Sequence, residues 1–200
     1  IEHIVWELQR YSMDAGSLLG IAKRCIDKGY KQLFSAISRN IKDDDNYYRE
    51  VLYKIFDDDK KDFLQALCYK NYELSDHVKY DVTLYACNNS DDLLADFQLL
   101  HNADLLDYRS VLDIGMDGGQ LKYFKFLHRN DYKFNIYICN ILAKHGYIRC
   151  IEYLHKQGYK LRKRTLINAM EKKHYNCVKR LIKMGCPIDE GYAKLTEKID

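Results

Sequence analysis

Histidine recurs in this chain at a constant interval. His101, His128 and His155 are equally spaced, and a row of imidazoles could bind a metal ion or respond to pH near neutrality. Packed helices lie about 8–10 Å apart, which is too far for histidines on neighbouring helices to share one ion. A histidine near the C-terminal end of a helix also interacts favourably with the helix dipole. We therefore expect a structural role for these histidines and no metal site.

Basic residues form a second group that could do chemistry, in this case the binding of phosphates or of an acidic protein. They are Lys160, Arg162, Lys163, Arg164, Lys172, Lys173, Lys179 and Arg180. Binding through such residues would weaken with added salt. No nucleic-acid-binding motif accompanies them, and the acidic remainder of the chain would repel a long duplex. A protein partner is therefore favoured, with nucleic acid as the less favoured ligand.

The motifs of the common enzymes are missing from the sequence. It contains no glycine-rich phosphate loop, no H-E-x-x-H and no nucleophile elbow, so we expect no enzymatic activity and no cofactor. Seven cysteines without a C-x-x-C pair indicate neither a disulfide framework nor a zinc ribbon. This cysteine usage is typical of a reducing compartment, and we expect a cytoplasmic location. No apolar run approaches the length of a membrane span.

All of these residues belong to a sequence that repeats. Between Thr83 and Ile188 the chain matches itself without a gap at one constant shift. The four copies run through residues 92–103, 119–130, 146–157 and 173–184. Two weaker copies precede them at altered spacing and begin near Gly29 and Asp59. A fixed period of about 27 residues indicates a repeat architecture.

One repeat can be interpreted as two short amphipathic helices joined by a turn. The apolar residues expected on one face of the first helix are Ile138, Cys139, Leu142 and Ala143, and those of the second are Ile148, Ile151 and Leu154. Gly146 and Gly158 can end the two helices, because glycine tolerates a left-handed cap. Cys150 and Cys177 occupy the same place in successive copies and are expected to fill space between neighbouring repeats.

Helices this short are marginal in isolation, so their apolar faces must be buried by stacking each repeat on the next. The sequence therefore predicts an all-α repeat solenoid of about six helix-turn-helix repeats. We expect residues 21–200 to form this array as a single domain. Residues 1–20 are expected to form an N-terminal capping helix or to continue from a longer chain.

The repeat pattern resembles a known family. A small residue in the first helix, Gly-x-x-x-x-(Ile/Val)-x-x-Leu in the second helix and a glycine before the loop resemble the ankyrin repeat. The short period, the Phe-Leu-His and Tyr-Leu-His triplets at 126–128 and 153–155, and the ending at 185–189 are similar to the divergent ankyrin repeats of giant DNA viruses of amoebae. The resemblance covers residues 80–190 well and residues 20–75 loosely.

Two features depart from the family pattern. The usual Thr-Pro-Leu-His opening is missing, and Asp92 and Lys173 replace the glycine that links the two helices of a repeat. We therefore expect the turns at Asp92 and Lys173 to differ from the turns that contain glycine.

The resemblance implies a binding module with no chemistry of its own. Ankyrin arrays recognise other proteins through a concave helix face and loop tips, and a viral member would act as a host-interaction factor in the host cytoplasm or nucleus. The residues that flank the inter-helix turns are Asp117, Lys144, His145, Glu171 and Lys172, and those expected on a loop are Arg162, Lys163 and Arg164. These eight residues are the predicted partner-binding set.

Charge is distributed unevenly along the chain, whose net charge is +3. Residues 41–107 contain 7 Lys and Arg against 16 Asp and Glu, whereas residues 108–200 contain 19 against 9. Two alternatives therefore stay open beside protein recognition. The basic C-terminal repeats could bind a polyanion such as nucleic acid or a phospholipid headgroup, or the acidic and basic portions could join copies of the chain into a structural assembly.

Overall fold

A computed structural model describes residues 13–39, 41, 44–67, 74–90 and 92–188. All of the regular structure in these residues is helical, which confirms the all-α prediction. The chain divides into two compact units, one ending at Ser110 and the other beginning at Val111. The prediction that residues 21–200 form a single array therefore stays a prediction.

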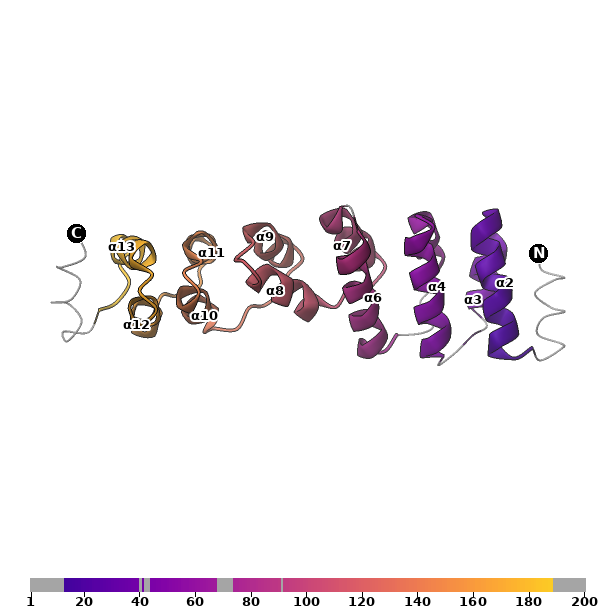
Figure 1. The fold of residues 1–200 in the computed structure, drawn as a ribbon, viewed down its shortest axis with the longest axis horizontal. Helices are drawn as coiled ribbons and strands as arrows, with labels where there is room; N and C mark the ends of the chain where they lie inside the picture. The colour runs from indigo at the N-terminus through magenta and orange to yellow at the C-terminus, as the bar shows by residue number, and fades with distance from the viewer. Residues whose placement is uncertain (1–12, 40, 42–43, 68–73, 91, 189–200) are drawn as a thin grey trace. The chain divides into compact units, whose positions relative to one another are not determined.

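The first unit alternates long and short helices. Their bounds are α2 (Ala15–Lys28), α3 (Lys31–Ser38), α4 (Asp45–Asp57), the 3-10 turn η1 (Lys61–Phe63), α5 (Leu64–Leu67), α6 (Asp76–Asn89) and α7 (Leu93–Asn102). The long helices pack in series, α2 against α4 and α4 against α6, while α3 pairs with α2 and α7 with α6 (Figure 1). In the core, the rings of Phe34 and Phe63 meet edge to face with their centroids 5.2 Å apart.

The described part of the expected capping segment, residues 13–20, leads into and begins helix α2. Residues 1–12 of the expected capping segment lie outside the described residues. Asp14 precedes α2, and its carboxylate accepts a hydrogen bond from the Ser17 N–H at 2.8 Å. A carboxylate at this position satisfies an amide that the first turn leaves without a partner. The helix therefore begins at Ala15 and runs through the expected boundary.

The second unit is built from pairs of short helices. Their bounds are α8 (Tyr108–Met116), which begins just before the unit does, α9 (Leu121–Arg129), α10 (Ile138–Lys144), α11 (Ile148–Lys156), α12 (Lys163–Glu171) and α13 (Tyr175–Lys183). Within pairs, α10 packs against α11 and α12 against α13 (Figure 1). Between pairs, α10 packs against α12, and α11 packs against both α9 and α13. The second helices α9, α11 and α13 each begin one full sequence period after the one before.

The cores of these helices follow the apolar pattern of the sequence. The buried residues of α10 are the four expected ones, Ile138, Cys139, Leu142 and Ala143. In α11, Ile151 and Leu154 are buried as expected, whereas Ile148 is only half-buried. Cys150 and Cys177 are both buried, which agrees with their expected role as small apolar residues between neighbouring helices.

The first helix of a pair ends on a residue with left-handed backbone. Gly146, after α10, has a φ of 75°. Its N–H donates to the Ala143 carbonyl, and the next N–H, that of Tyr147, donates to the Leu142 carbonyl at 3.0 Å. Such paired bonds satisfy carbonyls that a helix end leaves without partners, and they turn the chain sharply. The second helix can therefore begin within a few residues and pack against the first.

The same backbone recurs after the second helix of each pair. Asp104, Asp131, Gly158 and Gly185 have φ of 56°, 59°, 94° and 75° and follow one another at intervals of one sequence period. Each N–H at these positions donates to a carbonyl three residues back. Aspartate, unlike most residues other than glycine, visits this region readily. Asp104 and Asp131 therefore end their helices in the same way as Gly158 and Gly185 do later in the chain.

The turns at Asp92 and Lys173 were both expected to differ from the glycine turns, and only one does. Asp92 has a negative φ of −127° and caps α7 by accepting a hydrogen bond from the Ala95 N–H at 3.3 Å. Lys173 instead has a φ of 58°, and its N–H donates to the Met170 carbonyl at 2.9 Å. The expectation was wrong at Lys173, because the hydrogen bonds of the cap hold even a residue with a Cβ in the left-handed region.

A buried ion pair joins η1 to α7 inside the first unit. Asp96 is 1% exposed, and its Oδ1 lies 2.8 Å from Nζ of Lys61. Neither carboxylate oxygen has a hydrogen bond of good geometry, so the attraction of the lysine charge is the main compensation for burying the carboxylate. Lys61 is therefore a residue on which the stability of this unit depends.

We expect Lys173→Gly to raise the free energy of unfolding by about 1 kcal/mol, because it removes the strain of a side chain in the left-handed region. Urea denaturation measures the change. The matched control is Lys172→Gly, whose φ of −93° is unstrained and which should be neutral or destabilising. Equal effects of the two substitutions would contradict the assignment of the cap to residue 173.

We expect Lys61→Met to lower the free energy of unfolding by about 3 kcal/mol, because it leaves the Asp96 carboxylate buried without a counter-charge. Adding Asp96→Leu should recover most of that loss in chemical denaturation. Lys31→Met is the control, since Lys31 pairs with Asp62 at an exposed site, where a pair contributes about 1 kcal/mol or less. Similar losses for Lys61→Met and Lys31→Met would show that the buried pair is not needed.

Candidate functional site

All eight residues of the predicted partner-binding set are exposed, and all lie in the second unit. Lys144 is the last residue of α10 and Glu171 the last of α12, and Asp117 directly follows α8. These three residues occupy equivalent places, one sequence period apart. His145 and Lys172 directly follow α10 and α12. The structure therefore places five of the set at the C-terminal ends of first helices, as expected.

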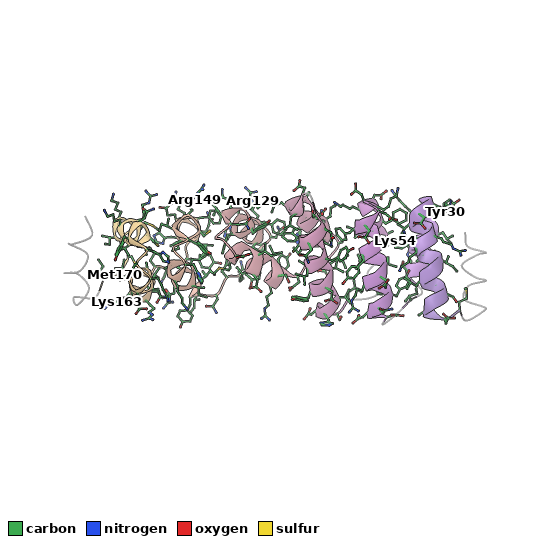
Figure 2. The ribbon with its side chains drawn as sticks, viewed as in Figure 1. Tyr30, Lys54, Arg129, Arg149, Lys163 and Met170 are labelled. Atoms are coloured by element: carbon green, nitrogen blue, oxygen red, sulfur yellow. The ribbon has the colours of Figure 1, made fainter. Side chains whose placement is uncertain are left out.

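Of the other three residues, Arg162 lies on the loop as expected, whereas Lys163 and Arg164 do not. Lys163, which Figure 2 labels, is the first residue of α12. Arg164 follows it in the first turn, and Arg162 directly precedes the helix. The Thr165 hydroxyl accepts a hydrogen bond from the Arg162 N–H at 3.1 Å, so the cap comes from inside the helix. The sequence did not indicate that α12 starts at Lys163, because arginine is not a usual N-cap residue. The Arg164 guanidinium nevertheless lies 3.5 Å from the carboxylate of Glu171, another residue of the predicted set, at the other end of α12.

Three exposed apolar residues beside this set were missed by the sequence analysis. Ile136, Tyr137 and Ile141 are 60%, 51% and 43% exposed, and we call them the apolar patch. Tyr137 precedes α10 directly, and Ile141 lies within it. The sequence analysis assigned them no role, but Tyr137, Ile141 and Lys144 are spaced by four and then three residues, which places them on one face of a helix. The buried residues of α10 occupy the opposite face, so this spacing was the available signal.

The apolar patch lies next to basic residues of the following helix pair. The Arg162 guanidinium carbon lies 5.3 Å from the centroid of the Tyr137 ring. Because α10 packs against α12, the residues of α12 equivalent to Tyr137 and Lys144 continue the same surface. Those residues are Arg164 and Glu171, which are exposed. We define the first-helix face as the apolar patch together with Lys144, Arg162, Arg164 and Glu171.

The packing of α10 on α12 is fixed below this face by buried and half-buried polar groups. The Thr165 hydroxyl donates to the Asn140 side-chain oxygen at 2.7 Å, and the Asn168 side-chain amide donates to the Asn140 backbone oxygen at 2.8 Å. These two hydrogen bonds from α12 to a single residue of α10 hold the two helices at a defined spacing. The first-helix face is therefore supported by a rigid base.

The histidine row has the structural role that we expected. The His128 ring lies 3.3 Å from the Tyr153 hydroxyl, and the His155 ring 3.1 Å from the Tyr159 carbonyl. His101 makes its own contact with the Tyr108 hydroxyl. Each ring thus has a separate partner near the end of its helix. Within the part of the chain that the structure describes, no three His, Cys, Asp or Glu side chains are grouped so that they could hold a metal ion.

The described cysteine thiols are poorly suited to nucleophilic chemistry. Burial raises the pKa of the Cys139, Cys150 and Cys186 thiols to about 11. Burial also raises the pKa of Cys177 to about 12. A thiol must lose its proton to attack a substrate, and these four stay protonated at neutral pH.

Neither a membrane segment nor a known relative adds to this description. Of the helices in the described ranges, none combines the length and apolar character that crossing a membrane requires. Comparison of the chain with models of known protein families, with curated proteins and with solved structures gave no match. A function must therefore be inferred from the surface of the second unit itself.

Proposed function

We propose that the chain is a non-enzymatic, ankyrin-like repeat protein that recognises a protein partner through the first-helix face. The repeat interpretation is supported by second helices that begin one sequence period apart and by left-handed caps at the same interval. The recognition proposal is carried by one observation, the exposure of Ile136, Tyr137 and Ile141 beside a rim of charged side chains.

The composition of this face suits a protein partner. Apolar side chains grouped on a surface and rimmed by polar residues mark binding sites, because their contact with water is unfavourable. Tyrosine and arginine are among the residues most enriched where interface energy is concentrated. Here Arg162 lies over the Tyr137 ring, a contact that favours this position of the ring before a partner arrives. Less side-chain entropy is then lost on binding.

The charged rim would set the orientation of the partner. Lys144 ends α10, which carries the apolar patch, and Arg164 and Glu171 lie on α12, which packs against α10. The pair between Arg164 and Glu171 is exposed and 3.5 Å long, so it contributes little to stability. Rim charges of both signs act mainly on the rate of association and on the choice of partner. A partner with a complementary pair of charges around an apolar side chain would fit this face.

The location that goes with this function is a reducing compartment. None of the six described cysteines forms a disulfide, and ankyrin-like repeats of the viral type would meet their partners in the host cytoplasm or nucleus. There the first-helix face would act as a viral host-interaction surface. On the first-helix face itself, the exposed apolar residues favour a protein partner over phospholipid headgroups.

We expect Tyr137→Ser combined with Ile141→Ser to abolish capture of a defined protein from a nuclease-treated eukaryotic cell lysate, as read by mass spectrometry. Both side chains are exposed, so the free energy of unfolding should change by only about 0.5 kcal/mol. Tyr175→Ser is the matched control, because Tyr175 is also 51% exposed but lies on α13.

The proposal predicts that the wild-type chain and Tyr175→Ser retain the same protein, and that the double variant does not. Retention of that protein by all three, or retention of material that nuclease removes and nothing else, would contradict recognition through the first-helix face.

A further inference from the structure

The second helices carry a repeated stripe of charged residues on their outer side. In α9, Lys122, Lys125 and Arg129 are spaced by three and then four residues, which places them on one helical face. The equivalent stripe of α11 is Arg149, Glu152 and Lys156, and that of α13 is Asn176, Lys179 and Lys183. We define the basic face as Lys122, Arg129, Arg149, Lys156, Lys179 and Lys183, all of which are exposed.

The basic face and the first-helix face lie on different helices of the second unit. Figure 2 labels Arg129 and Arg149 on one side of this unit, and Lys163 and Met170 of α12 on the other. Since α11 packs against both α9 and α13, the three stripes are neighbours. Helices packed in this way lie about 8–10 Å apart. Arg129, Lys156 and Lys183, at the ends of successive helices, therefore form a continuous row of positive charge.

The positive charge of this unit is not balanced from within. Its described residues, 111–188, contain 16 Lys and Arg and only 5 Asp and Glu. Two of these acids are already engaged, Glu152 with Arg180 at 2.5 Å and Glu171 with Arg164. The Glu152 carboxylate is the one negative charge on the stripes, and Arg180 neutralises it. None of the six side chains of the basic face has a carboxylate partner among the described residues.

The first unit shows the opposite arrangement. Its basic side chains pair with carboxylates of neighbouring helices, as Lys23 does with Glu50 at 2.8 Å and Arg49 with Asp81 at 2.7 Å. Lys23 and Arg49 are therefore neutralised by carboxylates of their own unit. The described residues of the second unit carry a positive charge that their own carboxylates do not compensate, which makes the basic face a candidate surface for binding an anion.

We propose that the basic face binds the phosphate backbone of a nucleic acid, independently of sequence. A phosphate backbone carries a charge at every nucleotide, so it can follow a row of lysines and arginines without a precise register. The six residues contain no apolar side chain that would anchor an acidic peptide.

The test is a titration of the full chain into a short, fluorescently labelled, mixed-sequence DNA duplex at low and at physiological salt, because the acidic part of the chain would repel a long duplex. The duplex should bind at low salt and weaken as salt rises. Replacing Arg129, Lys156 and Lys183 by Gln removes one row of the basic face. We expect this triple variant to bind at least about tenfold more weakly at low salt, with the slope of log affinity against log salt shallower by about three.

A second triple variant controls for net charge. Lys28→Gln, Lys60→Gln and Lys133→Gln remove the same charge from exposed positions outside both faces, and binding should change by less than about threefold. Circular dichroism confirms that both variants keep their helical content. No duplex binding at low salt, or equal weakening by the two variants, would overturn the proposal. Tighter binding of polyglutamate or of phosphatidylserine vesicles than of the duplex would also overturn it.

These outcomes are separable from those of the protein-recognition test. The triple variant of Arg129, Lys156 and Lys183 keeps the residues of the first-helix face in place, and the duplex titration contains no protein partner. Nucleic-acid binding by the basic face can therefore be refuted while protein recognition by the first-helix face is confirmed, and the reverse is also possible.

Discussion

Each short helix of the second unit is followed by a residue held in the left-handed backbone region, and the position of every later helix depends on this constraint. At Gly146 and Lys173 the cap turns the chain from the first helix of a pair into the second, and at Asp131 and Gly158 it turns the chain out of the pair. The paired hydrogen bonds of the cap make the turn short and fixed in direction. Helices this short are unstable alone, so only such tight turns let each one bury its apolar side against the next.

This packing divides the polar surface of the unit between two sets of helices. The first helices α10 and α12 are tied together through Asn140 and leave Tyr137 and Ile141 exposed within a charged rim. The second helices α9, α11 and α13 bury one side and present lysine and arginine on the other. We propose a protein partner for the first surface and a nucleic-acid backbone for the second. One chain could then bring a protein and a nucleic acid together without any catalytic group.

The sequence predicted those parts of the structure that follow from apolar spacing and from glycine. The four buried residues of α10 and the turn at Gly146 were expected from a helical period and a cap residue. The start of α12 was missed because Arg162 gives no capping signal, and the cap comes from Thr165 inside the helix. The turn at Lys173 was predicted wrongly because backbone hydrogen bonds hold this residue in the left-handed region. The residue type alone does not reveal these bonds. Exposure of Ile141 was missed because hydrophobic character alone does not tell which side of a helix is covered.

The most direct test of the repeat architecture is the thermal unfolding, followed by circular dichroism, of a chain lacking residues 146–172. This deletion removes one full period and joins His145 to Lys173, which already has the left-handed backbone of Gly146. We expect unchanged helical content per residue and a cooperative transition at a somewhat lower temperature, because one stacked repeat is lost. Deletion of residues 150–172 breaks the period and should abolish cooperative unfolding of this unit. Loss of the cooperative transition in both deletions alike would contradict an array of equivalent helix pairs.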